Sequence, residues 1–306
     1  MELRTPSPLR PNDIIRIVPT ARAITAAELQ DGIALAESWG LRVQLSDGIG
    51  RKAFQQAGTA AERTTDLQAA INDPEVRAIW CARGGYGTVH LLDQLDLSPL
   101  HSDPKWIAGF SDITALHNAL RMIRMPSIHA QMPFAIGNKT EACTESLRRA
   151  LFGETLTIHA TEATCINPGD SEANLVGGNI SVLYSLRGTP WDLDPTGTIL
   201  FLEDLDELLY HLDRMTQNLR LGGWFKDLAG LVIGGLSDMH DKLESDPFGR
   251  TGEEIIQAAI GAASYPVCFN FPAGHIADNR ALVLGQRAKL SVSDHGTTLS
   301  FGDVLV

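Results

Sequence analysis

A chain of 306 residues can bury one large hydrophobic core or two smaller ones, and its 44% hydrophobic and 20% charged residues are typical of globular proteins. The formal net charge of −12 argues against a nucleic-acid partner, because phosphate groups would be repelled. The four cysteines form no C-x-x-C pair, so neither a zinc knuckle nor a disulfide framework is indicated, and Cys81 and Cys268, in apolar runs, are expected to be buried thiols.

The N-terminal residues 1–6 have neither the basic start nor the apolar core of a signal peptide. No apolar run in the sequence approaches the length that spans a membrane. We therefore expect a cytoplasmic protein with no membrane partner.

The N-terminal half alternates predicted strands with predicted helices. Thr25 with Glu28, and Thr59 with Glu62, have the spacing of capping boxes that open helices, and Gly40 is expected to end the first helix. The predicted order is strand 14–18, helix 25–39, strand 41–45, helix 59–72, strand 76–81, short helix 88–95 and a strand that begins at Trp106. This order predicts a mostly parallel sheet with helices on both faces and ligands bound outside the carboxyl ends of its strands.

A glycine-rich loop, Arg83-Gly84-Gly85-Tyr86-Gly87, follows the third predicted strand. It lacks the Lys-Ser/Thr continuation of a phosphate-binding loop and the spacing of a dinucleotide-binding loop. The loop is interpreted either as a tight turn or as a place where backbone N–H groups approach a ligand or a developing oxyanion. The local sequence does not separate these two interpretations.

Ser111 stands at the corner between the strand at Trp106 and a predicted helix with apolar residues at Ile113, Leu116 and Leu120. A serine before a helix is a good N-cap, and the local sequence favours that role. Gly109, two positions earlier, also permits the sharp bend of a nucleophile elbow. No glycine follows two positions after Ser111, so the G-x-S-x-G pattern is incomplete.

Loop-forming residues at 161–173 predict a linker between an N-terminal domain, 1–160, and a C-terminal domain, 174–306. The second half is predicted to contain a helix ending near Leu186, a strand 198–202, a helix 207–219, strands 228–233 and 267–271, and further alternating strands near the C-terminus.

Several acidic and histidine residues follow predicted strands. Glu203 ends one strand, but Asp204, Asp206 and Glu207 crowd the same turn and could take its role. His275 ends another strand behind a glycine, and His129 is a further candidate; His117 and His211 lie on predicted helices and are interpreted as surface or packing residues. No H-E-x-x-H spacing is present, which disfavours a metal hydrolase.

A hydroxyl, a carboxylate and an imidazole at strand ends are the groups that a serine hydrolase needs. Their order along the chain would be Ser, Glu and His.

The chain resembles the LD-carboxypeptidases, serine peptidases that include muramoyltetrapeptide carboxypeptidase and the microcin C immunity peptidase. The resemblance extends over nearly the whole length. It rests on Ala82 to Gly87, Gly109 to His117, Gly177-Gly178-Asn179, Gly188-Thr189-Pro190, Leu200 to Asp204, Tyr210 to Met215 and Phe271 to His275.

The resemblance implies a flavodoxin-like N-terminal domain and a C-terminal α/β domain with a small, barrel-like sheet. It implies a catalytic triad of Ser111, Glu203 and His275 that requires no metal or cofactor, and it selects Glu203 among its acidic neighbours. It implies an oxyanion hole from the backbone N–H groups of Gly85 and Asp112, and a homodimer. Two further residues, Arg83 and Tyr86, are expected to contact substrate, Arg83 through the free carboxylate of a peptide.

The function expected from the resemblance is hydrolysis of the L,D-peptide bond to the terminal D-alanine of murein tetrapeptides, in cell-wall recycling. One alternative is cleavage of aminoacyl-nucleotide conjugates, as by the immunity peptidase. Another is a non-catalytic protein of the same fold that binds a small ligand. One departure concerns specificity: relatives commonly have His-Gly-Pro where this chain has His129-Ala130-Gln131.

Overall fold

The computed structural model describes residues 3–243 and 245–302, which divide into two compact units. The first unit contains residues 3–156 together with Ala277–Gly285. The second contains Thr157–Ile276 and Gln286–Gly302. Across the described residues, no helix is both long and apolar enough to cross a membrane.

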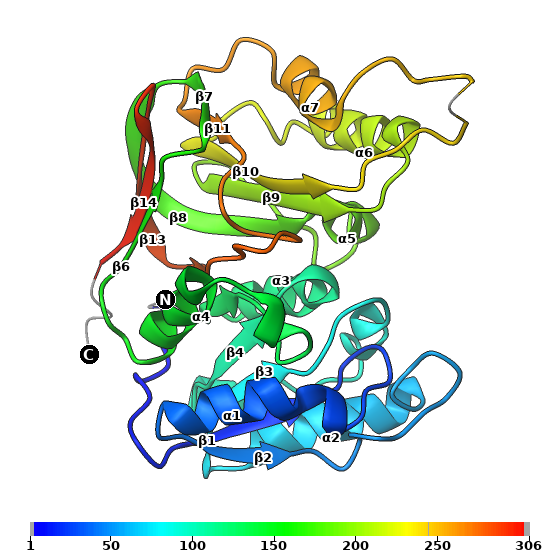
Figure 1. Cartoon of the computed structure of the whole chain (residues 1–306), viewed down its shortest axis with the longest axis vertical. Coiled ribbons are helices and arrows are strands. Elements are labelled where there is room, and N and C mark those ends of the chain that lie inside the picture. The colour runs from blue at the N-terminus through cyan, green and yellow to red at the C-terminus, as the bar shows by residue number, and fades with distance from the viewer. Residues whose placement is uncertain (1–2, 244, 303–306) are drawn as a thin grey trace. The chain divides into compact units, whose positions relative to one another are not determined.

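A six-stranded sheet with the order β12-β5-β4-β3-β1-β2 forms the centre of the first unit (Figure 1). Its strands are β1 (Ile14–Val18), β2 (Arg42–Leu45), β3 (Val76–Cys81), β4 (Trp106–Gly109), β5 (Ser127–His129) and β12 (Leu282–Leu284). The first five run parallel, and β12 pairs antiparallel with β5. The mostly parallel sheet predicted from the sequence is confirmed, but the return of a distant strand to its edge was not predicted.

The helices of the first unit begin and end largely where their sequence signals indicate. They are η1 (Ala27–Leu29), α1 (Gln30–Ser38), α2 (Ala60–Asn72), η2 (Thr88–Leu91), η3 (Ser98–His101), η4 (Ser111–Ile113), α3 (Thr114–Met122), η5 (Ile136–Asn138) and α4 (Glu141–Leu151). Thr59 and Glu62 form the predicted capping box at the start of α2. Gly40, with φ +80°, follows α1, because a left-handed residue stops the helix.

Helices cover both faces of this sheet. Leu67 on α2 and Leu116 on α3 belong to the same buried cluster as Ile79 of β3. Trp80, the next residue of β3, points to the opposite face. There it stacks on Trp39 at the end of α1, with ring centroids 6.4 Å apart.

An eight-stranded sheet with the order β6-β14-β13-β8-β9-β10-β11-β7 forms the centre of the second unit. Its strands are β6 (Leu156–Ala160), β7 (Thr164–Asn167), β8 (Gly169–Asn179), β9 (Ile199–Leu205), β10 (Gly230–Ser237), β11 (Val267–Phe269), β13 (Arg287–Ser293) and β14 (Gly296–Phe301). Four neighbouring strands, β8 to β11, are parallel.

One expectation for this region differs from the structure, and a second is made more specific by it. Residues 161–173, expected as a linker, contain β7 and the beginning of β8. The sheet expected to resemble a barrel curls far enough for β7 to contact β13 and β14. Its strand order nevertheless ends at β6 and β7, so within the described residues it is an open sheet and not a closed barrel.

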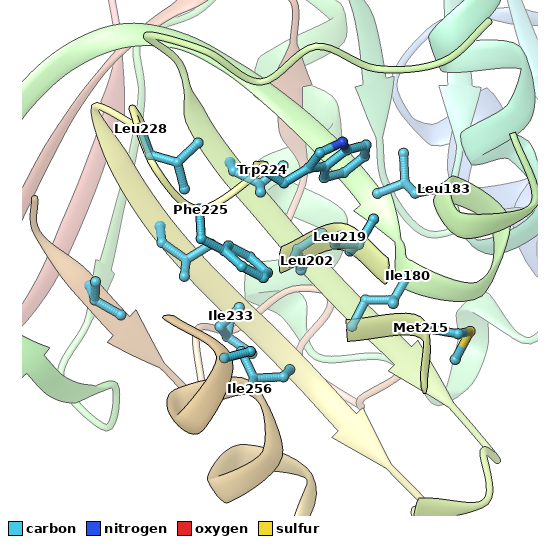
Figure 2. Packing of buried hydrophobic residues seen from close by; sticks show 14 of the residues in the cluster. Ile180, Leu183, Leu202, Met215, Leu219, Trp224, Phe225, Leu228, Ile233 and Ile256 are labelled. Atoms are coloured by element: carbon cyan, nitrogen blue, oxygen red, sulfur yellow. The ribbon is translucent and has the colours of Figure 1, made fainter. Parts of the chain in front are cut away.

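The core of the second unit lies between its parallel strands and three helices, α5 (Ile180–Ser185), α6 (Leu209–Leu221) and α7 (Gly252–Ile260). Figure 2 shows side chains from all three helices gathered over β9 and β10. The labelled members are Ile180, Leu183, Leu202, Met215, Leu219, Trp224, Phe225, Leu228, Ile233 and Ile256. This packing fixes the two strands whose carboxyl ends carry polar residues. The expected burial of Cys81 and Cys268 is also confirmed.

Candidate active site

Ser111 lies in a sharp turn between β4 and α3. Its φ is +65°, in the left-handed region that residues other than glycine rarely adopt. Neither η4 nor α3 has a side-chain capping bond, and their N-cap residues are Phe110 and Ile113. The N-cap interpretation of Ser111 is therefore wrong. A strained serine between a strand and a helix is typical of a nucleophile elbow.

Gly109 makes this turn possible by its small size. A Cβ atom on Gly109 would lie 2.9 Å from Ile113 Cγ1, so a larger residue would push the first helical turn away from β4. The backbone carbonyl of Gly109 accepts a hydrogen bond from the Ala130 N–H at 3.0 Å. The strand end before Ser111 is thus held on both sides.

The glycine-rich loop lies directly against Ser111. A Cβ atom on Gly84 would be 3.3 Å from Ser111 Cβ and 3.5 Å from Ser111 Oγ. Gly85 has φ +113° and is exposed, and Gly87 has φ +132°. These backbone conformations require glycine and bring the loop's main chain beside the serine hydroxyl.

The Asp112 carboxylate ties this loop to the elbow. It accepts hydrogen bonds from the N–H groups of Gly87 at 3.3 Å and Thr88 at 2.8 Å. Arg63 Nη1 donates to the Gly87 carbonyl at 2.8 Å. Burial raises the pKa of Asp112, while these bonds and the Arg63 charge oppose that rise. Arg63 could not be singled out from the sequence, because an arginine within an amphipathic helix carries no functional signal.

Two buried histidines lie behind the elbow. His117 contacts the Gly109 carbonyl through Nε2 at 3.0 Å and Ser127 Oγ through Nδ1 at 2.8 Å. Burial lowers the pKa of His117 to about 3, so its ring is neutral. Of the two roles that the sequence allowed, surface or packing, His117 therefore has the packing role. His129 ends β5, as predicted, with its ring centroid 5.8 Å from that of Phe110.

In the second unit, His275 pairs with Glu203. His275 Nδ1 lies 2.6 Å from Glu203 Oε2, and the Glu203 side chain, within β9, is fully buried. A Cβ atom on Gly274 would lie 2.8 Å from Glu203 Oε2, so this glycine allows the imidazole to reach the carboxylate. Ser237 Oγ donates to the His275 carbonyl at 2.8 Å and fixes the backbone. An imidazole whose Nδ1–H is held by a buried carboxylate presents Nε2 as a general base.

The other acidic residues of this turn have different partners. Asp204 Oδ1 accepts from Asn179 Nδ2 at 2.8 Å, and Oδ2 accepts from the Ser181 N–H at 2.9 Å, which fixes the start of α5. Glu207 pairs with His211 on α6, and the Asp206 side chain is 75% exposed. The structure therefore distinguishes Glu203 from three neighbours that the local sequence left equivalent.

Burial, followed by the neighbouring Glu203 carboxylate, raises the pKa of Asp204 to about 7 from an ordinary value of 3.8. Between these values the folded protein holds a proton that the unfolded chain releases, so stability falls as pH rises from about 4 to about 7. Each unit of pKa difference corresponds to about 1.4 kcal/mol. We expect the Asp204→Asn variant to lack this decline in urea unfolding at pH 4.5 and 7.5. Parallel pH dependence of the two proteins would contradict the expectation.

The two expected substrate contacts lie in the first unit beside the glycine loop. The Arg83 guanidinium lies 4.2 Å from the centroid of the Phe134 ring and 3.8 Å from Glu28 Oε1. Tyr86 is 54% exposed, and its ring meets the edge of His90 with centroids 5.4 Å apart. Ser111, Gly85, Asp112 and these two residues thus belong to one unit, and Glu203 and His275 to the other. In the part of the chain that the structure describes, no group of three or more His, Cys, Asp or Glu side chains is arranged to hold a metal ion.

Family models match both units of the chain. The model for the LD-carboxypeptidase N-terminal domain matches residues 15–130, and that for the LD-carboxypeptidase C-terminal domain matches residues 172–290. A probable murein peptide carboxypeptidase of Bacillus subtilis is 31% identical over 307 residues, which cover 97% of this chain and 94% of the relative.

Solved structures agree with the family models. The muramoyltetrapeptide carboxypeptidase from Oxalobacter formigenes has a TM-score of 0.85 and 28% identity, over 96% of this chain and 100% of that one. MccF in complex with glutamyl sulfamoyl guanosine has a TM-score of 0.87 over 98% of this chain and 99% of that one. Its identity of 19% shows a shared fold alone.

Proposed function

Since this chain belongs to the LD-carboxypeptidase family and is a serine-type LD-carboxypeptidase, we propose that its substrate is a murein tetrapeptide. It hydrolyses the bond between an L-configured centre and the terminal D-alanine, in cytoplasmic recycling of the cell wall. The names of the Bacillus and Oxalobacter relatives support this substrate class. The observation that carries the chemistry is the 2.6 Å contact between His275 Nδ1 and buried Glu203.

The proposed reaction uses Ser111, His275 and Glu203 as a triad. Ser111 Oγ attacks the scissile carbonyl carbon while His275 Nε2 takes the hydroxyl proton. The tetrahedral intermediate then breaks its C–N bond, His275 returns the proton to the departing amine of D-alanine, and the shortened peptide remains as an ester on Ser111. Water, deprotonated by His275, attacks this ester, and His275 returns the proton to Ser111 Oγ as the C–O bond breaks and the shortened peptide leaves. Glu203 orients the imidazole and stabilises its protonated form throughout.

The oxyanion is proposed to bind the backbone N–H groups of Gly85 and Asp112. A Cβ atom on Gly84 would lie only 3.5 Å from Ser111 Oγ, so the loop backbone runs close to the serine hydroxyl. This closeness supports a position of the next residue, Gly85, near the reacting carbonyl. Asp112 directly follows the nucleophile, and its carboxylate holds the loop that carries Gly85. Donors fixed before the reaction stabilise developing charge without reorganisation.

Substrate contacts are proposed for Arg83 and Tyr86. The Arg83 side chain is 24% exposed beside the loop, and a guanidinium can bind a carboxylate through two parallel hydrogen bonds. Tyr86 presents an exposed aromatic ring next to Gly85. The homodimer implied by the family resemblance is part of the same proposal.

Incubation with a defined murein tetrapeptide tests the function. We expect mass spectrometry to show the tripeptide and free D-alanine, and a fluorophosphonate probe to label Ser111. An aminoacyl sulfamoyl nucleoside, offered at the same concentration, is expected to turn over more slowly. Faster turnover of that conjugate would favour the immunity-peptidase function, and absence of both turnover and labelling would favour a non-catalytic binding protein.

A further inference from the structure

Arg22, which sequence analysis did not single out, lies in the loop after β1 and beside the glycine-rich loop. Its backbone forms an antiparallel bridge with Gln56. The flanking bonds from Ala23 N–H to the Gln55 carbonyl, at 2.9 Å, and from Ala57 N–H to the Ala21 carbonyl, at 3.0 Å, extend this contact. The position of Arg22 is therefore fixed by main-chain bonding.

The Arg22 side chain passes directly over Gly85. A Cβ atom on Gly85 would lie 2.2 Å from Arg22 Cδ and 2.6 Å from Arg22 Cγ. Glycine is therefore needed at position 85 for two reasons: its positive φ forms the turn, and its lack of a side chain leaves room for Arg22. Arg22 is exposed, so packing alone does not account for its place.

Arg22 and Arg83 form a pair of like charges. The proximity of Arg22 adds to burial, the larger cause, in lowering the pKa of Arg83. The nearest acid, Glu28, lies 3.8 Å from Arg83, and its other oxygen accepts bonds from the Thr25 N–H and hydroxyl. Among the residues that the structure describes, Arg22 forms no ion pair. One partly engaged carboxylate beside Arg83, and none paired with Arg22 among these residues, leaves an excess of positive charge that favours a bound anion.

We infer that Arg22 and Arg83 together bind the terminal carboxylate of the peptide, an inference that rests on the proposed function. The carboxylate carbon of the leaving residue is three bonds from the scissile carbonyl carbon. With bond lengths of about 1.33, 1.46 and 1.52 Å, the two carbons are no more than about 4 Å apart. When Gly85 N–H holds the scissile oxygen, a cation over Gly85 is therefore within reach of that carboxylate.

The local charge matters because the chain as a whole is acidic. A net charge of −12 gives no general attraction for an anionic peptide. The paired arginines would select peptides with a free C-terminus, which is what distinguishes an exopeptidase from an enzyme that cleaves within a chain. Carboxylates elsewhere in the peptide lie farther from the scissile bond. The experiment therefore tests amidation of an internal carboxylate separately from amidation of the terminal one.

The test compares binding of a D-alanine-terminated peptide with that of its terminal carboxamide, by calorimetry on Ser111→Ala protein to prevent turnover. We expect the free acid to bind about 10- to 100-fold more tightly, as charge-assisted hydrogen bonds predict. Adding Arg22→Met is expected to remove most of this preference, and Arg22→Lys to restore part of it. Arg42→Met, at the exposed first residue of β2, is the matched control and is expected to keep the preference.

Equal binding of acid and amide, or a preference that survives Arg22→Met, would overturn the inference. A preference that moves instead with amidation of an internal carboxylate would also overturn it. These binding measurements do not depend on catalysis. They can therefore be told apart from failure of the proposed function, in which the unaltered protein would release no D-alanine. An Arg22-dependent preference without turnover would still establish a carboxylate site.

Discussion

Replacing Ser111 with alanine is expected to lower kcat/KM for release of D-alanine by about ten-thousand-fold or more, the loss typical of a removed nucleophile. Alanine cannot form the ester intermediate, so only the residual catalysis by positioning and oxyanion binding remains. KM is expected to change little, because the hydroxyl acts mainly in the chemical step. Release of D-alanine, measured with both proteins over a range of peptide concentrations, gives kcat and KM for the comparison.

The matched control is Ser102→Ala in the same unit, where the hydroxyl donates to the Pro99 carbonyl at 3.2 Å on the surface. This variant is expected to keep its activity within about twofold, as exposed substitutions usually do. Both variants should unfold at the temperature of the unaltered protein, since alanine at position 111 keeps the same left-handed backbone. Undiminished activity of the Ser111 variant would show that another group is the nucleophile.

Part of the first unit could be predicted because its central strands are almost entirely buried. Strands 14–18 and 76–81 are short and mostly apolar, with one arginine each, and both are observed with the predicted bounds. The capping signal at Thr59 is local, so it too could be read directly. Local periodicity and capping are sufficient where neighbouring residues decide the structure.

The second unit shows where this approach fails. β8 begins with Gly169, Asp170, Ser171 and Glu172, which have low strand propensity and alternate between exposed and half-buried positions. Its pairing with β13, more than a hundred residues later, supplies the hydrogen bonds that the local sequence does not suggest. A polar strand of this kind is indistinguishable from a loop until its partner is known.

The candidate site divides in the same way. For a serine before a helix the local sequence favours a cap over an elbow, and the positive φ of Ser111 together with the missing capping bond decides for the elbow. Neighbouring residues Glu203 and Asp204 point to opposite faces of β9, but which face carries His275 depends on tertiary structure. Arg22 and Arg63 gave no signal, because their role arises from contacts with distant glycines. The family resemblance selected Glu203 where the local sequence could not.

The pairing of Glu203 with His275 leads to the second large effect. Glu203→Gln is expected to lower kcat by about a thousand- to ten-thousand-fold while KM stays nearly constant. Glutamine has nearly the same shape but offers an N–H donor, which favours the imidazole tautomer with its proton on Nε2. In that tautomer the nitrogen that should accept the serine proton is already protonated. The loss of the carboxylate charge also removes stabilisation of the imidazolium.

The chain provides a closely matched control in a second glutamate–histidine pair. Glu207 Oε2 lies 2.6 Å from His211 Nδ1 on α6, the same separation as in the Glu203–His275 pair. Glu207→Gln removes the same charge four residues further along the chain and is expected to change kcat by no more than about twofold, because this partly exposed pair takes no part in the proposed reaction.

The contrast between the pairs lies in burial, since the Glu203 side chain is fully buried and that of Glu207 is 18% exposed. A carboxylate removed from water interacts strongly with the proton that moves beside it, whereas water screens one at the surface. Steady-state kinetics of both variants on one tetrapeptide, from pH 5 to 9, separate the two cases. If the two glutamine variants lose activity equally, general charge and not the buried pair supports the reaction, and the triad assignment is wrong.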